Sequence, residues 1–131
     1  MRQRSAYCIF ATSVKVNSRN GDAGIGIYQS ELGYAEFFVR KRAGKYNLVV
    51  RVRTRSVLHE EAVLKLNRPS ADLLVRAHGD RYEFYFAGKE IARVDSALLS
   101  SEVAGGDGGV VIGPYCISGQ AEFSGFSYEE N

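Results

Sequence analysis

Apolar and polar residues alternate along much of this chain, which is the pattern of β-strands that bury one face. The clearest case is residues 46–55, where Leu48, Val50 and Val52 fall on one face. The opposite face of that segment carries Asn47, Val49, Arg51, Arg53 and Arg55. β-Branched and aromatic residues dominate the apolar set and prolines are rare, which also favours strands over helices.

The same reading along the chain predicts about ten short strands separated by turn signals. The predicted strands are 7–16, 23–30, 34–42, 46–55, 58–66, 71–78, 81–87, 90–95, 110–117 and 120–128. Asn20-Gly21-Asp22, Ala43-Gly44-Lys45, Gly79-Asp80 and Gly88-Lys89 are predicted turns, and residues 96–103 a helical turn or an irregular loop. We therefore expect one domain over residues 1–131, an all-β sandwich of two antiparallel sheets.

Charge and composition exclude several classes of partner. The 131 residues include 17 Lys and Arg against 15 Asp and Glu, so we expect neither nucleic-acid nor membrane binding. No apolar run approaches the ~20 residues of a membrane helix, and MRQRSAYCIF is too weakly apolar for a secretory signal. We thus expect a fragment or a mature protein. Cys8 and Cys116 either pair or are two buried free thiols.

Catalytic chemistry is not evident in the residue pattern. Glycoside hydrolysis uses two carboxyl groups ~5–10 Å apart, and no run places acids at alternate positions of one strand. We expect the carboxylates, including Glu36 and Glu83, to be solvated. His59 and His78 lack the partners of a nucleophile and its base. A structural calcium site is conceivable in this kind of sandwich, with loop acids available but no spacing that fixes ligands; these are Asp22, Asp95, Asp107 and Glu122.

Motifs spread over the chain resemble one known family. AHGDRYEFY at 77–85 is similar to its "A-DGD-Y-F-Y" hairpin, and Gly21-Asp22-Ala23-Gly24-Ile25 to its "gd-AGl" turn. The run from Asp95 through Glu102-Val103-Ala104-Gly105-Gly106 to Ile112-Gly113 and Tyr115 is similar to "vDa-yLStEvaGGFtG-yiGlYa". Their order resembles the C-terminal concanavalin A-like (jelly-roll) sandwich of glycoside hydrolase family 43, the β-xylosidase and arabinofuranosidase family.

That resemblance implies a role without chemistry of its own. In the family, the sandwich accompanies a separate catalytic β-propeller, and the aromatic residue after the Gly-Gly pair reaches toward the catalytic pocket. Gly105, Gly106 and Asp107 are then the loop facing the catalytic domain. Asp107 stands where the family has Phe, which argues against an apolar pocket-closing role here. The resemblance further implies a xylan-associated carbohydrate-binding module with no cofactor.

Candidate sugar-binding residues combine aromatic faces with planar polar groups. They are Tyr28, Gln29, Tyr34, Arg51, Arg53 and Tyr85. Tyr28 and Gln29 match a family strand, although packing in the core or at its rim is the alternative for Tyr28 and Tyr34. Tyr85 points away from Phe84 and Phe86 and is either a binding residue or plain surface.

Arg51, Arg53 and Arg55 lie on one face of one strand because strand side chains alternate with period two. They either pair with acids on neighbouring strands, such as Glu36, Glu60 or Glu61, or contact an acidic partner. A uronic-acid-substituted xylan would be such a partner; nucleic acid ranks lower because the overall charge is nearly balanced.

The leading hypothesis is a non-catalytic accessory and carbohydrate-binding module of a family 43 glycosidase. It would bind xylan or arabinoxylan and buttress a catalytic propeller. The alternative is a purely structural docking sandwich without sugar affinity, and an independent hydrolase is a third. An exposed tyrosine row favours sugar, whereas a continuous aliphatic patch favours docking.

Overall fold

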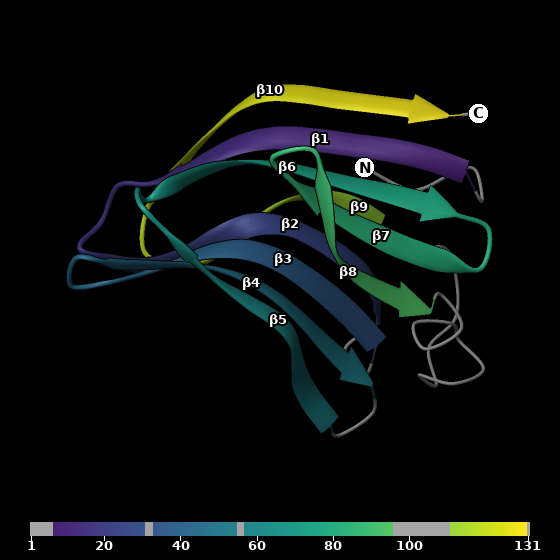
Figure 1. Ribbon diagram of the computed structural model, residues 1–131, viewed down its shortest axis with the longest axis horizontal. Helices are drawn as coiled ribbons and strands as arrows, with labels where there is room; N and C mark the ends of the chain where they lie inside the picture. Colours follow the sequence, from purple (N-terminus) through teal and green to yellow (C-terminus); the bar gives the residue numbers. More distant parts are fainter. Residues whose placement is uncertain (1–6, 31–32, 55–56, 96–110, 131) are drawn as a thin grey trace.

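The computed structural model describes residues 7–30, 33–54, 57–95 and 111–130, and these build a two-layered β-sandwich (Figure 1). Its strands are β1 (Tyr7–Val16), β2 (Asn20–Ser30), β3 (Gly33–Arg42), β4 (Lys45–Thr54), β5 (Val57–Leu66), β6 (Ser70–His78), β7 (Arg81–Phe86), β8 (Lys89–Asp95), β9 (Val111–Ser118) and β10 (Ala121–Glu130). The prediction of an all-β sandwich is confirmed.

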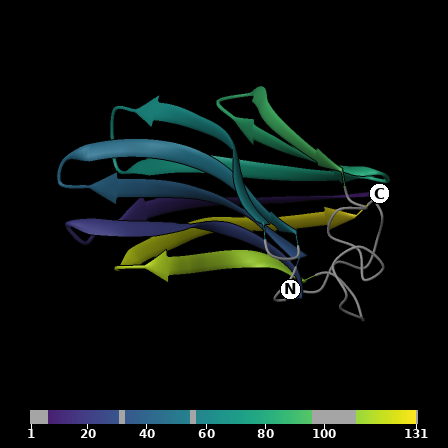
Figure 2. The same ribbon diagram turned by 90° about the horizontal axis from the view of Figure 1, so that it is seen from below.

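Each layer is a five-stranded antiparallel sheet. The first sheet has the order β10-β1-β6-β7-β8 and the second the order β5-β4-β3-β2-β9. In Figure 2 the edge strands β9 and β10 lie at the bottom of the view and β5 and β8 at the top. The chain crosses between the sheets after β1, β5, β8 and β9, so strands distant in sequence become neighbours.

The core lies between the sheets and follows the alternation seen in the sequence. Leu48, Val50 and Val52 of β4 are buried, as predicted, and face the first sheet. Phe37 of β3 and Phe84 of β7 meet across the layers edge to face, with ring centroids 5.4 Å apart. Such aromatic contacts add to the burial of apolar surface that holds the layers together.

Two tight hairpins carry alanine and glycine in left-handed conformations. Ala43 and Gly44 join β3 to β4 with φ of 47° and 88°, and Ala87 and Gly88 join β7 to β8 with φ of 53° and 77°. Positive φ at both central residues suits the right-handed twist of the strands. Both turns overlap the predicted ones, but Lys45 and Lys89, which were predicted as turn residues, already begin β4 and β8.

The predicted turn at Asn20-Gly21-Asp22 is wrong, because β2 already begins at Asn20. The chain reverses one step earlier, at residues 17–19, where the Ser18 hydroxyl donates to the Asn20 carbonyl over 2.6 Å. The Asn20 side chain accepts a hydrogen bond from the Ala43 amide at 3.0 Å and so ties this strand start to the next hairpin.

Strand β5 differs from the other strands of its sheet because it is exposed along nearly its whole length. It forms one edge of the second sheet and pairs only with β4. Four of its apolar side chains are exposed: Val57, Leu58, Val63 and Leu64. Exposed apolar edge strands are a recognised site of association.

Some predictions fall outside the described residues. They are the helical turn or irregular loop at 96–103, the residues Gly105, Gly106 and Asp107, and the ladder position Arg55. Within the described part of the chain, no helix is long and apolar enough to cross a membrane.

Candidate functional site

The outer face of the second sheet is organised in rows that run across the strands. Because paired residues of antiparallel strands point to the same side, one row contains Tyr28, Tyr34, Arg53 and Leu58. We call it the tyrosine row. The next row, two residues along each strand, contains Gly26, Glu36, Arg51 and Glu60 and is called the glutamate row.

The glutamate row is held by a buried ion pair. Arg51 places Nε at 2.9 Å and a terminal nitrogen at 2.7 Å from Oε1 of Glu36. The Glu36 side chain is 5% exposed and that of Arg51 17%. The prediction that Glu36 is solvated is therefore wrong: register with Arg51, which alternation within one strand does not reveal, makes its burial possible.

The following row shows how the arginines cover apolar surface on this outer face. Phe38 has no exposed surface, because the guanidinium groups of Arg51 and Arg40 lie 4.8 Å and 5.5 Å from its ring centroid. Arg40 also reaches Glu60 at 2.8 Å. By stacking on Phe38 and pairing with acids, these arginines cover the outer face of the second sheet with charged groups.

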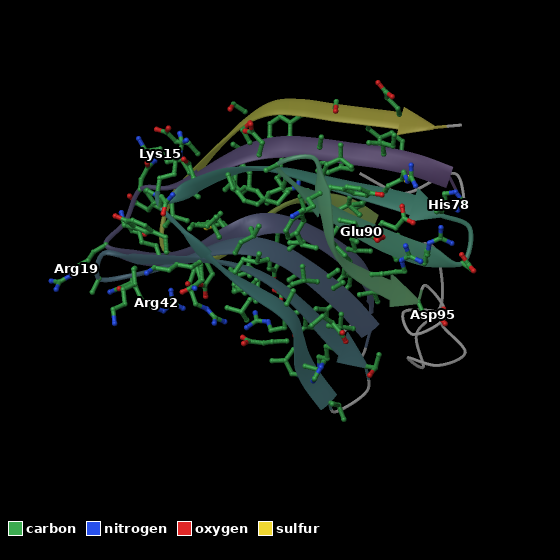
Figure 3. The ribbon with its side chains drawn as sticks, in the orientation of Figure 1. Lys15, Arg19, Arg42, His78, Glu90 and Asp95 are labelled. Carbon is green, nitrogen blue, oxygen red and sulfur yellow. The ribbon has the colours of Figure 1, made fainter. Side chains whose placement is uncertain are left out.

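Asp22, a third acid on this face, is also paired with an arginine. Asp22 lies 2.8 Å from Arg42, whose side chain projects at the turn end of the sheet (Figure 3). Oδ1 of Asp22 accepts no hydrogen bond from the residues described, although Nε of Arg40 lies 3.9 Å away. Asp22, Glu36 and Glu60 thus each have an arginine partner.

An open pocket of about 460 Å³ lies between the tyrosine row and strand β9. Its lining residues are Gly26, Ile27, Tyr28, Tyr34, Ala35, Glu36, Arg53, Gly113, Pro114 and Tyr115. The rings of Tyr28 and Tyr34 stack at 6.3 Å with an interplanar angle of 18°. Tyr28 and Tyr115 are 44% and 47% exposed, so aromatic surface is available to a ligand. We call this the tyrosine pocket.

Glycine shapes the floor of the tyrosine pocket. A Cβ added at Gly26 would come within 3.2 Å of Cβ of Tyr115, so the absent side chain lets the tyrosine lie over strand β2. Burial raises the pKa of Tyr115, and the nearby charge of Glu36 raises it further. The phenol therefore stays protonated and able to donate a hydrogen bond.

Arg53 has a different setting from Arg51. Its neighbours on the adjacent strands are Tyr34 and Leu58, neither of which carries a charge. Nε of Arg53 is buried and has no hydrogen-bond partner among the described residues. Among the described residues, the pocket therefore contains an arginine that is paired with no acid and whose Nε lacks an acceptor.

The structure brings only part of the predicted set together. Tyr28, Tyr34 and Arg53 line the pocket. Arg51 does not line it but is paired with Glu36, which does. Gln29 is on strand β2, but its side chain is not among those described. Tyr85 lies on β7, in the other sheet, and so belongs to a different surface.

On that other surface the Tyr85 hydroxyl donates a hydrogen bond to a buried carboxylate, that of Glu83. Glu83 is 1% exposed, and it accepts hydrogen bonds from Arg81 at 2.7 Å, Arg76 at 2.8 Å and the Tyr85 hydroxyl at 3.1 Å. Burial by itself would raise the pKa of Glu83, but these donors outweigh it and lower the pKa to about 2. The expectation that Glu83 is solvated is also wrong.

Sequence reasoning missed Tyr115, Pro114 and Gly26 as pocket residues. A signal existed, since Gly113 and Tyr115 stand in the run that resembles the family. What the sequence does not show is that β9 pairs with β2, with Gly113 opposite Gly26. Only this long-range pairing closes the pocket on its second side.

The remaining candidate chemistry is sparse. Cys8 on β1 is buried and Cys116 on β9 is exposed, and both are free thiols in different sheets. Among the residues described, no three His, Cys, Asp or Glu side chains are grouped to hold a metal ion. Glu36, the one acid among the described lining residues, is engaged by Arg51, and the stacked tyrosines beside it are suited to binding.

Fold and pocket together define a concanavalin A-like sandwich with an aromatic cavity on one outer face. A sequence model of the β-xylosidase C-terminal concanavalin A-like domain matches residues 1–129. The chain belongs to this family, the non-catalytic C-terminal module of family 43 enzymes, whose catalytic part is a separate propeller domain. A sequence search of curated proteins found no match.

Solved structures agree with the family in fold. Bacteroides ovatus Xyloglucan PUL GH43B superposes with a TM-score of 0.86 at 19% identity, covering 98% of this chain and 28% of that one. Xylan β-1,4-xylosidase from Bacillus halodurans C-125 gives 0.82 at 20% identity, covering 98% and 28%. The carbohydrate-binding module CBM66 from Bacillus subtilis gives 0.61 at 13% identity, covering 95% and 75%. The chain thus spans about 28% of the length of the two glycosidases.

Proposed function

We propose that this chain is the accessory domain of a family 43 glycosidase and binds a xylan- or arabinoxylan-type glycan in the tyrosine pocket. The observation that carries the proposal is the convergence of Tyr28, Tyr34 and Tyr115 on one open cavity of about 460 Å³. Ligand sites combine apolar aromatic walls with a few polar groups. The likeness to the carbohydrate-binding module CBM66 supports a glycan ligand, and the likeness to a xylan β-1,4-xylosidase supports the xylan class.

The pocket offers the two kinds of contact that a sugar ring needs. The exposed faces of Tyr28 and Tyr115 would stack against the apolar side of a pyranose. Phenol hydroxyls and Arg53 would hydrogen-bond the ring hydroxyls. One pocket of this size would hold a short stretch of glycan, so its role is to retain or orient a chain that another domain cleaves.

Calorimetric titration with xylo- and arabinoxylo-oligosaccharides tests this proposal. We expect saturable binding that Tyr28→Ala and Tyr115→Ala abolish. Tyr85→Ala is the matched control, because Tyr85 lies on the other sheet. Loss of binding in the Tyr85 variant alone would place the site on that other sheet. No heat with any oligosaccharide would refute the sugar-binding role.

A second candidate function, docking of the catalytic propeller, rests on strand β5. Its exposed side chains Val57, Leu58, Val63 and Leu64 form an apolar edge that a buttressing contact would cover. The chain's coverage of only 28% of the glycosidases leaves room for such a partner. We expect the isolated chain to self-associate in sedimentation experiments and Val63→Lys to reduce this. A monomer at high concentration would count against docking through β5.

A further inference from the structure

We propose that the tyrosine pocket selects a sugar unit that carries a carboxylate, a uronic acid, and that Arg53 binds this carboxylate. The inference deepens the proposed function and rests on it. It starts from two arginines of one strand, Arg51 and Arg53, which point to the same face but lie in different electrostatic settings.

The rows of the sheet determine this difference. In the glutamate row, Arg51 has Glu36 on one neighbouring strand and Glu60 on the other. In the tyrosine row, the corresponding neighbours of Arg53 are Tyr34 and Leu58. The neighbouring strands thus supply carboxylates to the first arginine and none to the second.

Three acids described on this face are each paired with an arginine other than Arg53. Glu36 is held by Arg51 at 2.7 Å, Asp22 by Arg42 at 2.8 Å and Glu60 by Arg40 at 2.8 Å. Within the described chain Arg53 takes part in no ion pair, and its buried Nε has no acceptor. A carboxylate in the pocket is the group that best fits this planar guanidinium, and it would approach the terminal nitrogens, because Nε is buried.

The aromatic walls of the pocket restrict the class of ligand further. A small inorganic anion would satisfy Arg53 but leave the faces of Tyr28 and Tyr115 uncovered. A neutral xylose unit would cover those faces but give Arg53 only hydroxyl acceptors. A uronic acid presents both a ring for stacking and a carboxylate beside it, within the available 460 Å³. Nucleic acid is disfavoured because the other arginines described on this face, Arg40, Arg42 and Arg51, are already paired.

Calorimetry with three matched ligands tests the inference. They are xylotetraose, xylotetraose substituted with one glucuronic acid, and the same acidic ligand after reduction of its carboxyl group to an alcohol. At low salt we expect the acidic ligand to bind about tenfold or more tighter than its reduced form, as a charge-assisted hydrogen bond implies.

The variants assign this preference to one residue. Arg53→Gln should lower the affinity for the acidic ligand to that for its reduced form, while Arg53→Lys should keep part of the difference. Arg19→Gln is the control, because it removes the same charge at the turn end of the sheet (Figure 3). That turn lies about 30 Å along β2 from Tyr28 at ~3.3 Å per residue.

The outcomes separate the inference from the proposed function. Equal affinity for the acidic and reduced ligands, with both lost in Tyr28→Ala, would overturn the uronic-acid inference and keep sugar binding. An acidic preference that persists in Arg53→Gln would overturn the role of Arg53. No binding of any of the three ligands would overturn both proposals. A preference lost only with Arg53 establishes the inference.

Discussion

The buried charge of Glu83 should control how the stability of this chain depends on pH. Glu83 is 1% exposed and is surrounded by Arg76, Arg81 and Arg93, with the Tyr85 hydroxyl as a further donor. The pKa of Glu83 is lowered from 4.5 to about 2. Because the folded chain favours the ionised form, its contribution is complete above pH 4.5 and is lost as pH falls toward 2.

The size of the effect follows from the pKa difference between the folded and unfolded chain. One pKa unit corresponds to about 1.4 kcal/mol, so a shift from 4.5 to about 2 stands for about 3 kcal/mol of unfolding free energy at pH 7. At pH 3 a little under half of this contribution is left, on the order of 1.4 kcal/mol. Below pH 2 it has essentially vanished.

Glu83→Gln mimics the protonated carboxyl and is the perturbation that tests this reasoning. Urea unfolding of wild type and variant from pH 2 to 7 should show a gap of about 3 kcal/mol at neutral pH that closes toward pH 2. Glu90→Gln is the control, because Glu90 pairs with Arg93 at the surface at 2.9 Å, where pairs contribute about 0.2–1 kcal/mol. Parallel stability profiles for wild type and Glu83→Gln would refute the assignment.

Four other substitutions probe the backbone and the paired and unpaired arginines by urea unfolding. Gly24→Ala should destabilise the fold by about 3 kcal/mol or more, because its Cβ would lie 2.0 Å from the Phe37 carbonyl oxygen; a normal midpoint would contradict this. Ala87→Asn should stabilise by about 0.5–1 kcal/mol by relieving an alanine at φ 53°, and a lower midpoint would argue against that strain. In the unliganded chain, Arg53→Met should stabilise by about 1 kcal/mol, whereas Arg51→Met should cost about 3 kcal/mol; equal losses would refute the contrast.

Local pattern predicted the strands and their inner faces, because period-two alternation in a segment such as 46–55 is a property of that segment alone. This local alternation does not show which distant strands pair with each other. Whether Tyr85 joins Tyr28 depends on which sheet holds β7, and whether Glu36 is buried depends on its register with Arg51. Pocket and charge network both arise from these long-range pairings, so the candidate site was predicted only in part.

We propose that the tyrosine pocket lies near the contact that this module would make with a catalytic domain. Asp107 ends the Gly-Gly run that in the family faces the catalytic domain, and Gly113, a pocket residue, follows six residues later. Six residues of chain span at most about 20 Å. If the Gly-Gly run meets the propeller here too, the pocket lies close to that contact. The domain would then hold the same glycan chain that the propeller cleaves, near the point of cleavage, and a remote tethering role would not fit.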